Sequence, residues 1–287
     1  MTNLDHLVVG LDDSNDSARA LRWAAAQTPQ LITAVHAFSP GLELLAASVQ
    51  INLDPVRAEH QNLLDTRWSA PARALGVPVD TVLIDDDPAT ALAHVAQTRS
   101  ADAIVIGHQG HHRWNAHHVG ETAGRLLHHC DTPLIVTNDT TEPQPLAGSI
   151  VVGLSRPANP DNPELQWAIN VAEHHKAQLH VVCLVEPMAY VDANYSRDMA
   201  DIHHEMREQL DALAATLRHQ HRTIGISTEV RDGPTLHELA AVTHETDAGL
   251  VVIGSHHPGL ISGFIAGSVA RLLPPLIRCP TAAVPHR

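Results

Sequence analysis

The chain has 287 residues, 44% hydrophobic and 17% charged, a balance typical of globular proteins and a length sufficient for two ordinary domains. Its net charge of −14 disfavours contact with a nucleic-acid backbone or an anionic membrane surface, and an aromatic content of 3% leaves little for stacking on bases. No apolar run approaches the roughly 18 residues of a membrane helix, the N-terminus lacks signal-peptide features, and the few cysteines are scattered, so we expect a cytoplasmic protein without nucleic-acid or membrane partners.

The first half of the chain alternates short apolar runs, typical of buried strands, with segments of helical periodicity. The expected strands are Asp5–Leu11, Leu31–Phe38, Val79–Ile84, Ala103–Ile106 and Pro133–Val136. The expected helices begin near Ser17, span Asp54–Ala74 with Val56, Leu63, Leu64 and Trp68 facing inward, run from Asp87 to about Thr98, and cover Gly120–His129. This alternation with short connections predicts a parallel sheet covered by helices on both faces.

A glycine-rich loop follows the fourth expected strand. Gly107 and Gly110 have Gly-x-x-Gly spacing, and Gly120 begins a helical segment after nine further residues. Glycines let a ligand approach the backbone, and the N–H groups and dipole at a helix N-terminus favour an anion such as phosphate. Glycine also closes ordinary strand-to-helix turns, so a purely structural interpretation stays open. Asp12, after the first strand, is expected near this loop, because ligands of such sheets bind beyond the carboxyl ends of strands where the strand order reverses.

The second half of the chain repeats this pattern. Three pairs of residues recur at a constant offset of 147: Gly107 and Gly254, Gly120 and Gly267, Pro133 and Pro280. The other expected elements are strands Ser149–Leu154, Gln178–Val185, Ile224–Val230 and Gly249–Ile253, a long helix near Ala193–His219, and a helix after Gly233-Pro234. The polar, aperiodic stretch Asn138–Gly148 separates the halves. We therefore expect two domains, residues 1–140 and 148–287, joined by a linker at residues 141–147.

The first half contains VVGLDDSNDSARALRWAA, IVIGHQG followed nine residues later by GET, and DTPLIVT, while the second contains VVIGSHH, GSV and RCPTAAV. Together these segments resemble a tandem universal stress protein, and the resemblance covers both halves. It implies two tandem five-stranded parallel α/β sandwiches of the adenine-nucleotide α-hydrolase type. It also implies a stress-response regulator that binds ATP, aided by Mg²⁺, and pairing through the last strand, either as a homodimer or as a pseudo-dimeric tandem monomer.

The resemblance also places the nucleotide contacts of the family on particular residues. In the first half it implies Asp12 as a ribose or adenine contact, Ala37 as a wall of the adenine pocket, and Gly107, Gly110, Gly120 and Thr122 as the phosphate loop. In the second half it points to Gly254, Gly267, Ser268 and Val269, with Leu184 at the position of Ala37.

Each half departs from the family pattern at residues that would meet the nucleotide. In the first half Glu121 stands where a serine or threonine hydroxyl would face phosphate. A carboxylate about 4 Å from a phosphate costs roughly 1 kcal/mol in water. In the second half His257 replaces the second glycine and Ser155 replaces Asp12. The first half is therefore the better nucleotide candidate.

Other conspicuous residues have competing interpretations. The histidines of the first glycine loop could bind a metal ion, bind phosphate in a pH-dependent way, or simply be polar surface residues. The surface role is favoured because they form no compact ligand set with a cysteine or carboxylate. These histidines are His108, His111, His112, His117 and His118. A solvated turn and helix start is favoured over Mg²⁺ binding for Asp85–Asp87. Packing roles are expected for Cys130, Cys279, Trp23 and Trp167.

The chain shows no Ser-His-Asp order with a nucleophile elbow, no Walker lysine and no paired carboxylates at a defined site. An efficient enzyme is therefore not favoured, and slow ATP hydrolysis is the most that we expect. Two hypotheses remain: a stress-response regulator that binds an adenine nucleotide, and a family member that has lost ATP and acts as a structural or protein-interaction module.

Overall fold

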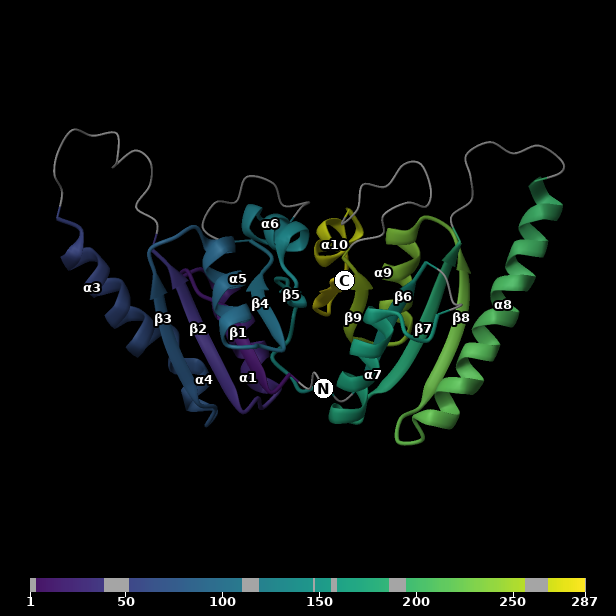
Figure 1. The fold of residues 1–287 in the computed structure, drawn as a ribbon, viewed down its shortest axis with the longest axis horizontal. Coiled ribbons are helices and arrows are strands. Elements are labelled where there is room, and N and C mark those ends of the chain that lie inside the picture. Colours follow the sequence, from purple (N-terminus) through teal and green to yellow (C-terminus); the bar gives the residue numbers. More distant parts are fainter. Residues whose placement is uncertain are drawn as a thin grey trace. The chain divides into compact units, whose positions relative to one another are not determined.

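The computed structural model describes residues 4–38, 52–109, 119–146, 148–155, 159–185, 195–255 and 268–286, without the side chains of residues 195–200 and 202. Its contacts separate two compact units, a first unit at Leu4–Pro145 and a second unit from Leu146 onward. Figure 1 shows both units.

The first unit is built on a parallel sheet with the strand order β3-β2-β1-β4-β5. Its strands are β1 (His6–Gly10), β2 (Leu31–Ala37), β3 (Val79–Ile84), β4 (Ala103–Gly107) and β5 (Leu134–Thr137). The central strands are rich in β-branched residues that are fully buried, as expected for a sheet covered on both faces. The chain order reverses between β1 and β4, so the loops after these two strands emerge side by side at the carboxyl edge.

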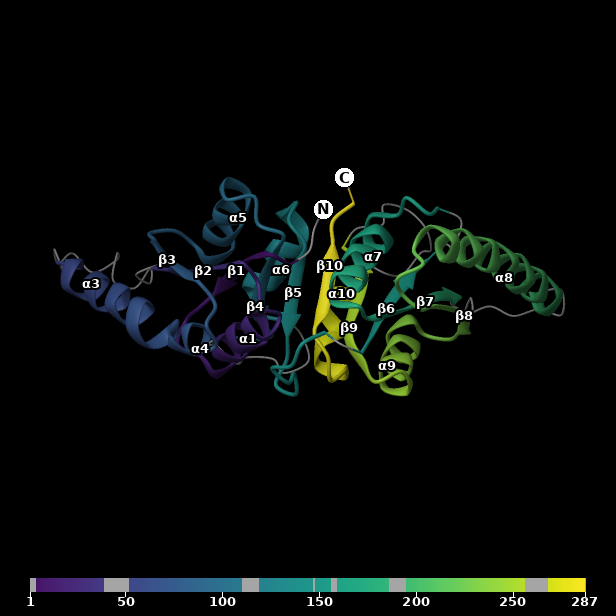
Figure 2. The same ribbon diagram turned by 90° about the horizontal axis from the view of Figure 1, so that it is seen from below.

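Helices cover both faces of this sheet. Helix α1 (Asn15–Ala26) packs on one face together with α4 (Ala70–Ala74), while α5 (Pro88–Thr98) and α6 (Glu121–His129) pack on the other. Figure 2 shows α1 and α5 on opposite sides of the strands. Trp23 of α1 is 1% exposed, which confirms the expected core position.

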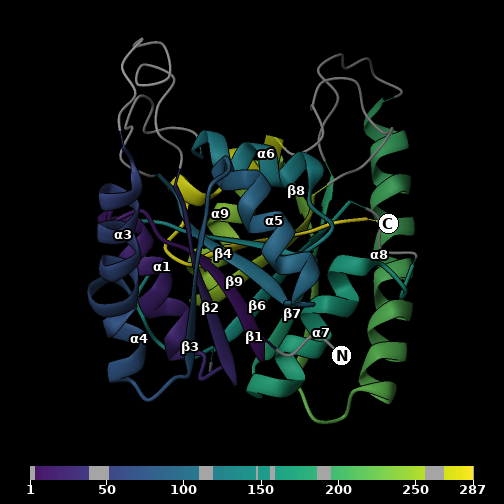
Figure 3. The ribbon, with the colours of Figure 1, turned by 60° about the vertical axis from the view of Figure 1, so that its left-hand side comes forward.

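The long helix expected at Asp54–Ala74 is divided into three parts. Helix α3 (Asp54–Leu63) continues into a π-helical turn, η1 (Leu64–Trp68), and α4 begins after Ser69. Pro71 lies in the first turn of α4 and lacks the N–H that a continuous helix would need. Helix α3 has no buried residue and lies on the outer side of the unit (Figure 3). The expectation that Val56 faces inward is therefore wrong, because this side chain is 42% exposed, whereas Leu64 and Trp68 are buried as predicted.

The second unit repeats the architecture, with a parallel strand order β10-β9-β6-β7-β8. Its strands are β6 (Ser149–Leu154), β7 (Gln178–Val185), β8 (Ile226–Asp232), β9 (Ala248–Gly254) and β10 (Thr281–Val284). Its helices are α7 (Pro163–His175), α8 (Tyr195–Gln220), α9 (Thr235–Glu245) and α10 (Ser268–Leu272), followed by the 3₁₀ turn η2 (Pro274–Leu276). Helix α7 contacts the central strands as α1 does in the first unit, and its Trp167 is buried as expected. The structure thus confirms the predicted α/β class with parallel sheets.

The three cysteines are buried in the two cores. Burial raises the pKa of the Cys130 thiol, that of Cys183 to about 11 and that of Cys279 to about 12. These thiols are protonated near neutral pH and therefore poor nucleophiles, which favours packing over redox sensing. None of the helices in the described ranges is long and apolar enough to span a membrane.

Candidate functional site

Asp12 lies two residues beyond β1, and its carboxylate is oriented by a local hydrogen-bond network. Its Oδ1 accepts hydrogen bonds from the Ser14 N–H at 3.1 Å and the Ser14 hydroxyl at 2.6 Å. The Asp12 N–H donates to Ser17 Oγ at 3.4 Å. Ser14 is also the N-cap of α1, where its Oγ accepts from the Ser17 N–H at 3.1 Å. The start of α1 therefore fixes both the backbone and the side chain of Asp12.

Strand register brings Ala37 and the first loop glycine to the same edge as Asp12. Gly10 pairs with Val35 in β2 and Val9 pairs with Val105 in β4, so Asp12 is level with Ala37, the half-buried last residue of β2. Three of the residues predicted for the site thus come from the ends of three neighbouring strands. Gly110 and four of the loop histidines, those at positions 111, 112, 117 and 118, lie outside the described residues.

Gly107, which ends β4, is required by packing. A Cβ at this position would lie 2.6 Å from the Cβ of Asp16 in α1, closer than real Cβ atoms approach one another. Asp16 is 6% exposed, and its Oδ2 accepts a hydrogen bond from the Gln109 N–H at 3.2 Å. Gly107 therefore allows α1 to approach β4, and Asp16 holds the beginning of the glycine loop.

Gly120, at the other end of the loop, meets no such obstacle among the residues that the structure describes. Its φ of −59° is accessible to any residue, and the nearest atom to a Cβ there would be the His108 carbonyl oxygen at 3.6 Å. Gly120 is the N-cap of α6, and no described side chain caps this helix. In the first turn Glu121 is exposed and Thr122 is half-buried. The N–H groups of the first turn have no side-chain cap among the described residues, and with the helix dipole they make this the best anion-binding position of the described part of the loop.

The acidic run Asp85–Asp87 is a turn and a helix start, as predicted. Asp87 is the N-cap of α5 and accepts from the N–H groups of Ala89 and Thr90. Partial burial alone would raise the pKa of Asp87, but the hydrogen bonds from Thr90 and Ala89 and the guanidinium of Arg125 outweigh it and lower the pKa below its ordinary value. Within the described ranges, no group of three or more histidine, cysteine or acidic residues is placed to hold a metal ion.

A pair of histidines that sequence reasoning did not single out lies beside Asp12. His36 in β2 is 8% exposed; its Nδ1 is 2.7 Å from the Leu11 carbonyl oxygen and its Nε2 is 2.8 Å from Nδ1 of His60 in α3. The Trp68 ring, in η1, packs edge-on against His36 with ring centroids 4.9 Å apart. The sequence does contain a signal for this pair. A histidine within the apolar strand LITAVHA is expected to be buried and to have hydrogen-bond partners.

The corresponding edge of the second unit is arranged differently. Ser155, at the position of Asp12, is exposed. A Cβ on Gly254 would collide with the imidazole of His286, whose Nε2 lies 2.9 Å from Oε2 of Glu164 in the first turn of α7. The Glu164 side chain is only 1% exposed. Leu184 is the last but one residue of β7, and Ser268 and Val269 begin α10; all three are half-buried. Gly267 and His257 lie outside the described residues.

Comparisons with known proteins agree with the repeated fold. The family model described as the universal stress protein family matches residues 3–138 and 148–285. A universal stress protein of Mycobacterium tuberculosis is 28% identical over 96% of this chain and 94% of its own length. A universal stress protein of Mycolicibacterium smegmatis is 23% identical over 92% of this chain and 91% of its own length. The crystal structure of a universal stress protein from Archaeoglobus fulgidus matches with a TM-score of 0.68 at 14% identity, covering 99% of this chain and 97% of that one.

Proposed function

Because the chain belongs to the universal stress protein family, matched twice along its length, we propose that it is a tandem stress-response regulator whose first unit binds an adenine nucleotide. The ligand that we propose is ATP with Mg²⁺. The phosphates lie at the N-terminus of α6, with Gly120 and Thr122, while Asp12 accepts hydrogen bonds from the ribose or adenine and Ala37 bounds the base. The family pattern assigns Gly107 and Gly110 to the same phosphate loop.

The observation that carries this proposal is the contrast between the two glycines of the described loop. Packing against Asp16 explains Gly107, but among the residues that the structure describes neither backbone conformation nor packing explains Gly120. A glycine without a steric reason, at an uncapped helix N-terminus, leaves backbone N–H groups accessible to a phosphate. Asp12 supports the same conclusion, because hydrogen bonds from Ser14 orient its carboxylate, so less ordering is needed on binding.

The second unit is less suited to the same ligand. Ser155 lacks the carboxylate that Asp12 offers to the ribose or adenine, and His257 stands where the second glycine of the family pattern is expected. We therefore assign the principal nucleotide site to the first unit. Gly254, Gly267, Ser268 and Val269 form the weaker site that the family pattern implies for the second unit.

One observation favours the alternative, a member without ATP that acts as a protein-interaction module. Glu121 places a carboxylate in the first turn of α6, where it competes with phosphate for the positive end of the helix dipole. Mass spectrometry of ligand released from freshly purified protein separates the two functions, because only the nucleotide-binding form carries an adenine nucleotide through purification.

Calorimetry on ligand-free protein tests the proposal directly. We expect ATP to bind in the micromolar range, about −8 kcal/mol. Gly120→Ser adds a hydroxyl that caps α6 and occupies the N–H groups, so it should weaken ATP but not adenosine. Asp12→Ala should weaken both ligands, and Ser155→Ala, the matched change in the second unit, should weaken neither. Absence of ATP binding up to millimolar concentration would overturn the proposal and favour the alternative.

A further inference from the structure

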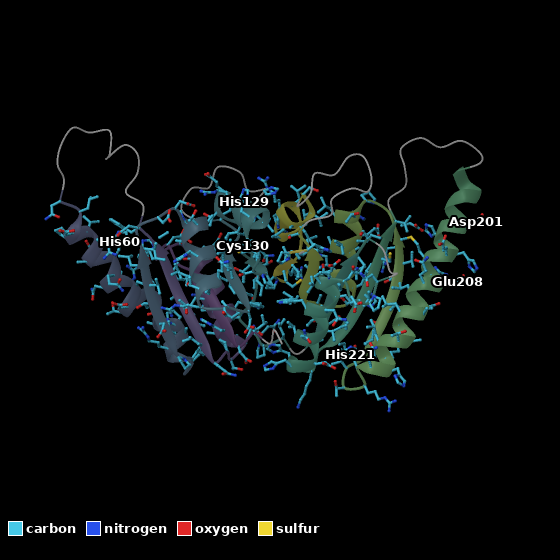
Figure 4. All side chains as sticks on the ribbon, in the orientation of Figure 1. His60, His129, Cys130, Asp201, Glu208 and His221 are labelled. Carbon is cyan, nitrogen blue, oxygen red and sulfur yellow. The ribbon has the colours of Figure 1, made fainter. Side chains whose placement is uncertain are left out.

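The histidine pair beside the candidate site forms a directed hydrogen-bond chain. A neutral imidazole donates through one ring nitrogen and accepts through the other, whereas a carbonyl oxygen only accepts. Since His36 Nδ1 faces the Leu11 carbonyl oxygen, it carries a proton and donates; in the neutral state of both rings His36 Nε2 then accepts from the Nδ1–H of His60. The chain therefore fixes the tautomer of both rings. Figure 4 labels His60 on α3, the outer helix from which this hydrogen-bond chain starts.

This chain ends on the peptide group that precedes Asp12. The Leu11 carbonyl and the Asp12 N–H belong to one planar peptide unit. His36 holds the oxygen of that unit, and Ser17 Oγ accepts from its N–H. With both ends held, the peptide plane cannot rotate, and the direction in which the Asp12 side chain leaves the backbone is set. The carboxylate is then held by Ser14.

The second unit shows that the fold itself does not require a histidine here. Leu154 pairs with Cys183 in β6 and β7, while the register of β1 and β2 places Leu11 opposite His36. Cys183 is fully buried, and burial raises the pKa of its thiol to about 11, so it is a neutral packing residue. The same sheet position thus accepts a small apolar side chain. A buried imidazole is harder to desolvate than a thiol, so packing alone does not explain His36.

We propose that His36 and His60 are positioning residues for the nucleotide site, which orient Asp12 toward the ribose or adenine through the Leu11 peptide group. This inference rests on the proposed nucleotide-binding function of the first unit. It assigns a role to α3 as well, because His60 links this otherwise exposed helix to the end of β1. The hydrogen-bond chain does not reach the phosphate end of the site. Its loss should therefore weaken the binding of ATP and of adenosine equally.

The first test measures the tautomers in the ligand-free protein. Nitrogen NMR of the histidine side chains distinguishes Nδ1–H from Nε2–H rings. We expect Nδ1–H for both His36 and His60, as the two hydrogen bonds require. An Nε2–H tautomer at His36 would overturn the proposal, since that ring would no longer donate to Leu11.

The second test compares variants that keep or remove the donor. The amide of asparagine places an N–H near the position of Nδ1, so His60→Asn keeps the donor to His36 and His60→Leu removes it. We expect His60→Leu to weaken ATP and adenosine equally, by about tenfold or 1.4 kcal/mol, and His60→Asn to restore most of the affinity. His36→Cys, which introduces the residue of the second unit, should weaken both ligands, while Cys183→Ser should leave them unchanged.

The outcomes separate this inference from the function on which it rests. If wild-type protein binds ATP and His60→Leu binds it equally well, the positioning role is wrong and the nucleotide site stands. If His60→Leu and His60→Asn lose affinity to the same extent, the ring acts only by packing, and the proposal is again overturned. If wild-type protein binds neither ATP nor adenosine, the proposed function fails and the positioning role fails with it.

Discussion

In the first unit the glycine that ends β4 packs directly against Asp16, whose carboxylate accepts the N–H of Gln109. In the second unit the glycine that ends β9 faces the imidazole of His286, which in turn contacts the buried Glu164. Both units therefore bring a carboxylate of the first helix near the end of the fourth strand. In the first unit it stabilises the start of the glycine loop, whereas in the second it binds the segment that follows the last strand.

This difference teaches that a repeated fold leaves the sheet edge free to diverge. The strands beneath the edge are alike, because a sheet buried on both faces requires apolar residues in every repeat. The edge has no such constraint, and there Asp12 corresponds to Ser155 and His36 to Cys183. The two units thus provide matched positions at which structural and ligand-binding roles can be separated.

The largest expected effects come from the two equivalent tryptophans. Trp23→Ala and Trp167→Ala each remove a buried ring and should cost about 3–5 kcal/mol of unfolding free energy. If the two halves are separate domains, each substitution lowers the midpoint of one denaturant transition and leaves the other in place. Urea unfolding followed by circular dichroism measures this. A single transition that shifts equally in both variants would show that the units unfold as one.

A second prediction contrasts the stability effects of substitutions at Gly107 and Gly120. Gly107→Ala places a methyl group against the Asp16 backbone and Cβ, so it should destabilise the first unit by about 1–3 kcal/mol. Gly120→Ser meets no such obstacle and gains a cap, so it should not lower stability. Urea unfolding of both variants checks the contrast, which is wrong if Gly107→Ala is tolerated or if Gly120→Ser destabilises the first unit to the same extent.

The strands and most helices were predictable from the sequence, because buried parallel strands appear as apolar, β-branched runs whatever their partners are. The π turn that divides the Asp54–Ala74 helix was not predicted, although Pro71 is a sequence signal for the start of α4. Asp12 and the glycine loop were proposed from strand order, glycine spacing and the family resemblance, and their role in nucleotide binding stays a prediction. The pairs His36 with His60 and Glu164 with His286 were missed, because each joins residues that only the register of strands and the packing of helices bring together.

Glu121 gives a prediction about the ligand rather than the fold. Its carboxylate is exposed in the first turn of α6, so its repulsion of a bound phosphate is screened by water and amounts to about 1 kcal/mol. Glu121→Ser should therefore tighten ATP by about fivefold to tenfold and leave adenosine unchanged. Calorimetry with both ligands measures the difference. Equal improvement for adenosine would mean that the change stabilises the unit as a whole and that Glu121 points away from the phosphates.

The smallest effect concerns the acid stability of the first unit. Asp87 caps α5 and has a lowered pKa in the folded state, so its stabilising contribution is fully present above its unfolded pKa and is lost as the pH falls through the folded pKa. The equivalent helix α9 of the second unit begins after Pro234 without a side-chain cap hydrogen bond among the described residues, so its N-terminus should not weaken in this window.

Asp87→Asn keeps a capping oxygen but no longer titrates. We expect this variant to lose the part of the acid-dependent decrease in unfolding free energy that belongs to Asp87, by less than about 1 kcal/mol because the pair with Arg125 is partly exposed. Urea unfolding between pH 2 and pH 6 measures it, and an unchanged pH profile in Asp87→Asn would show that the cap does not titrate in this range.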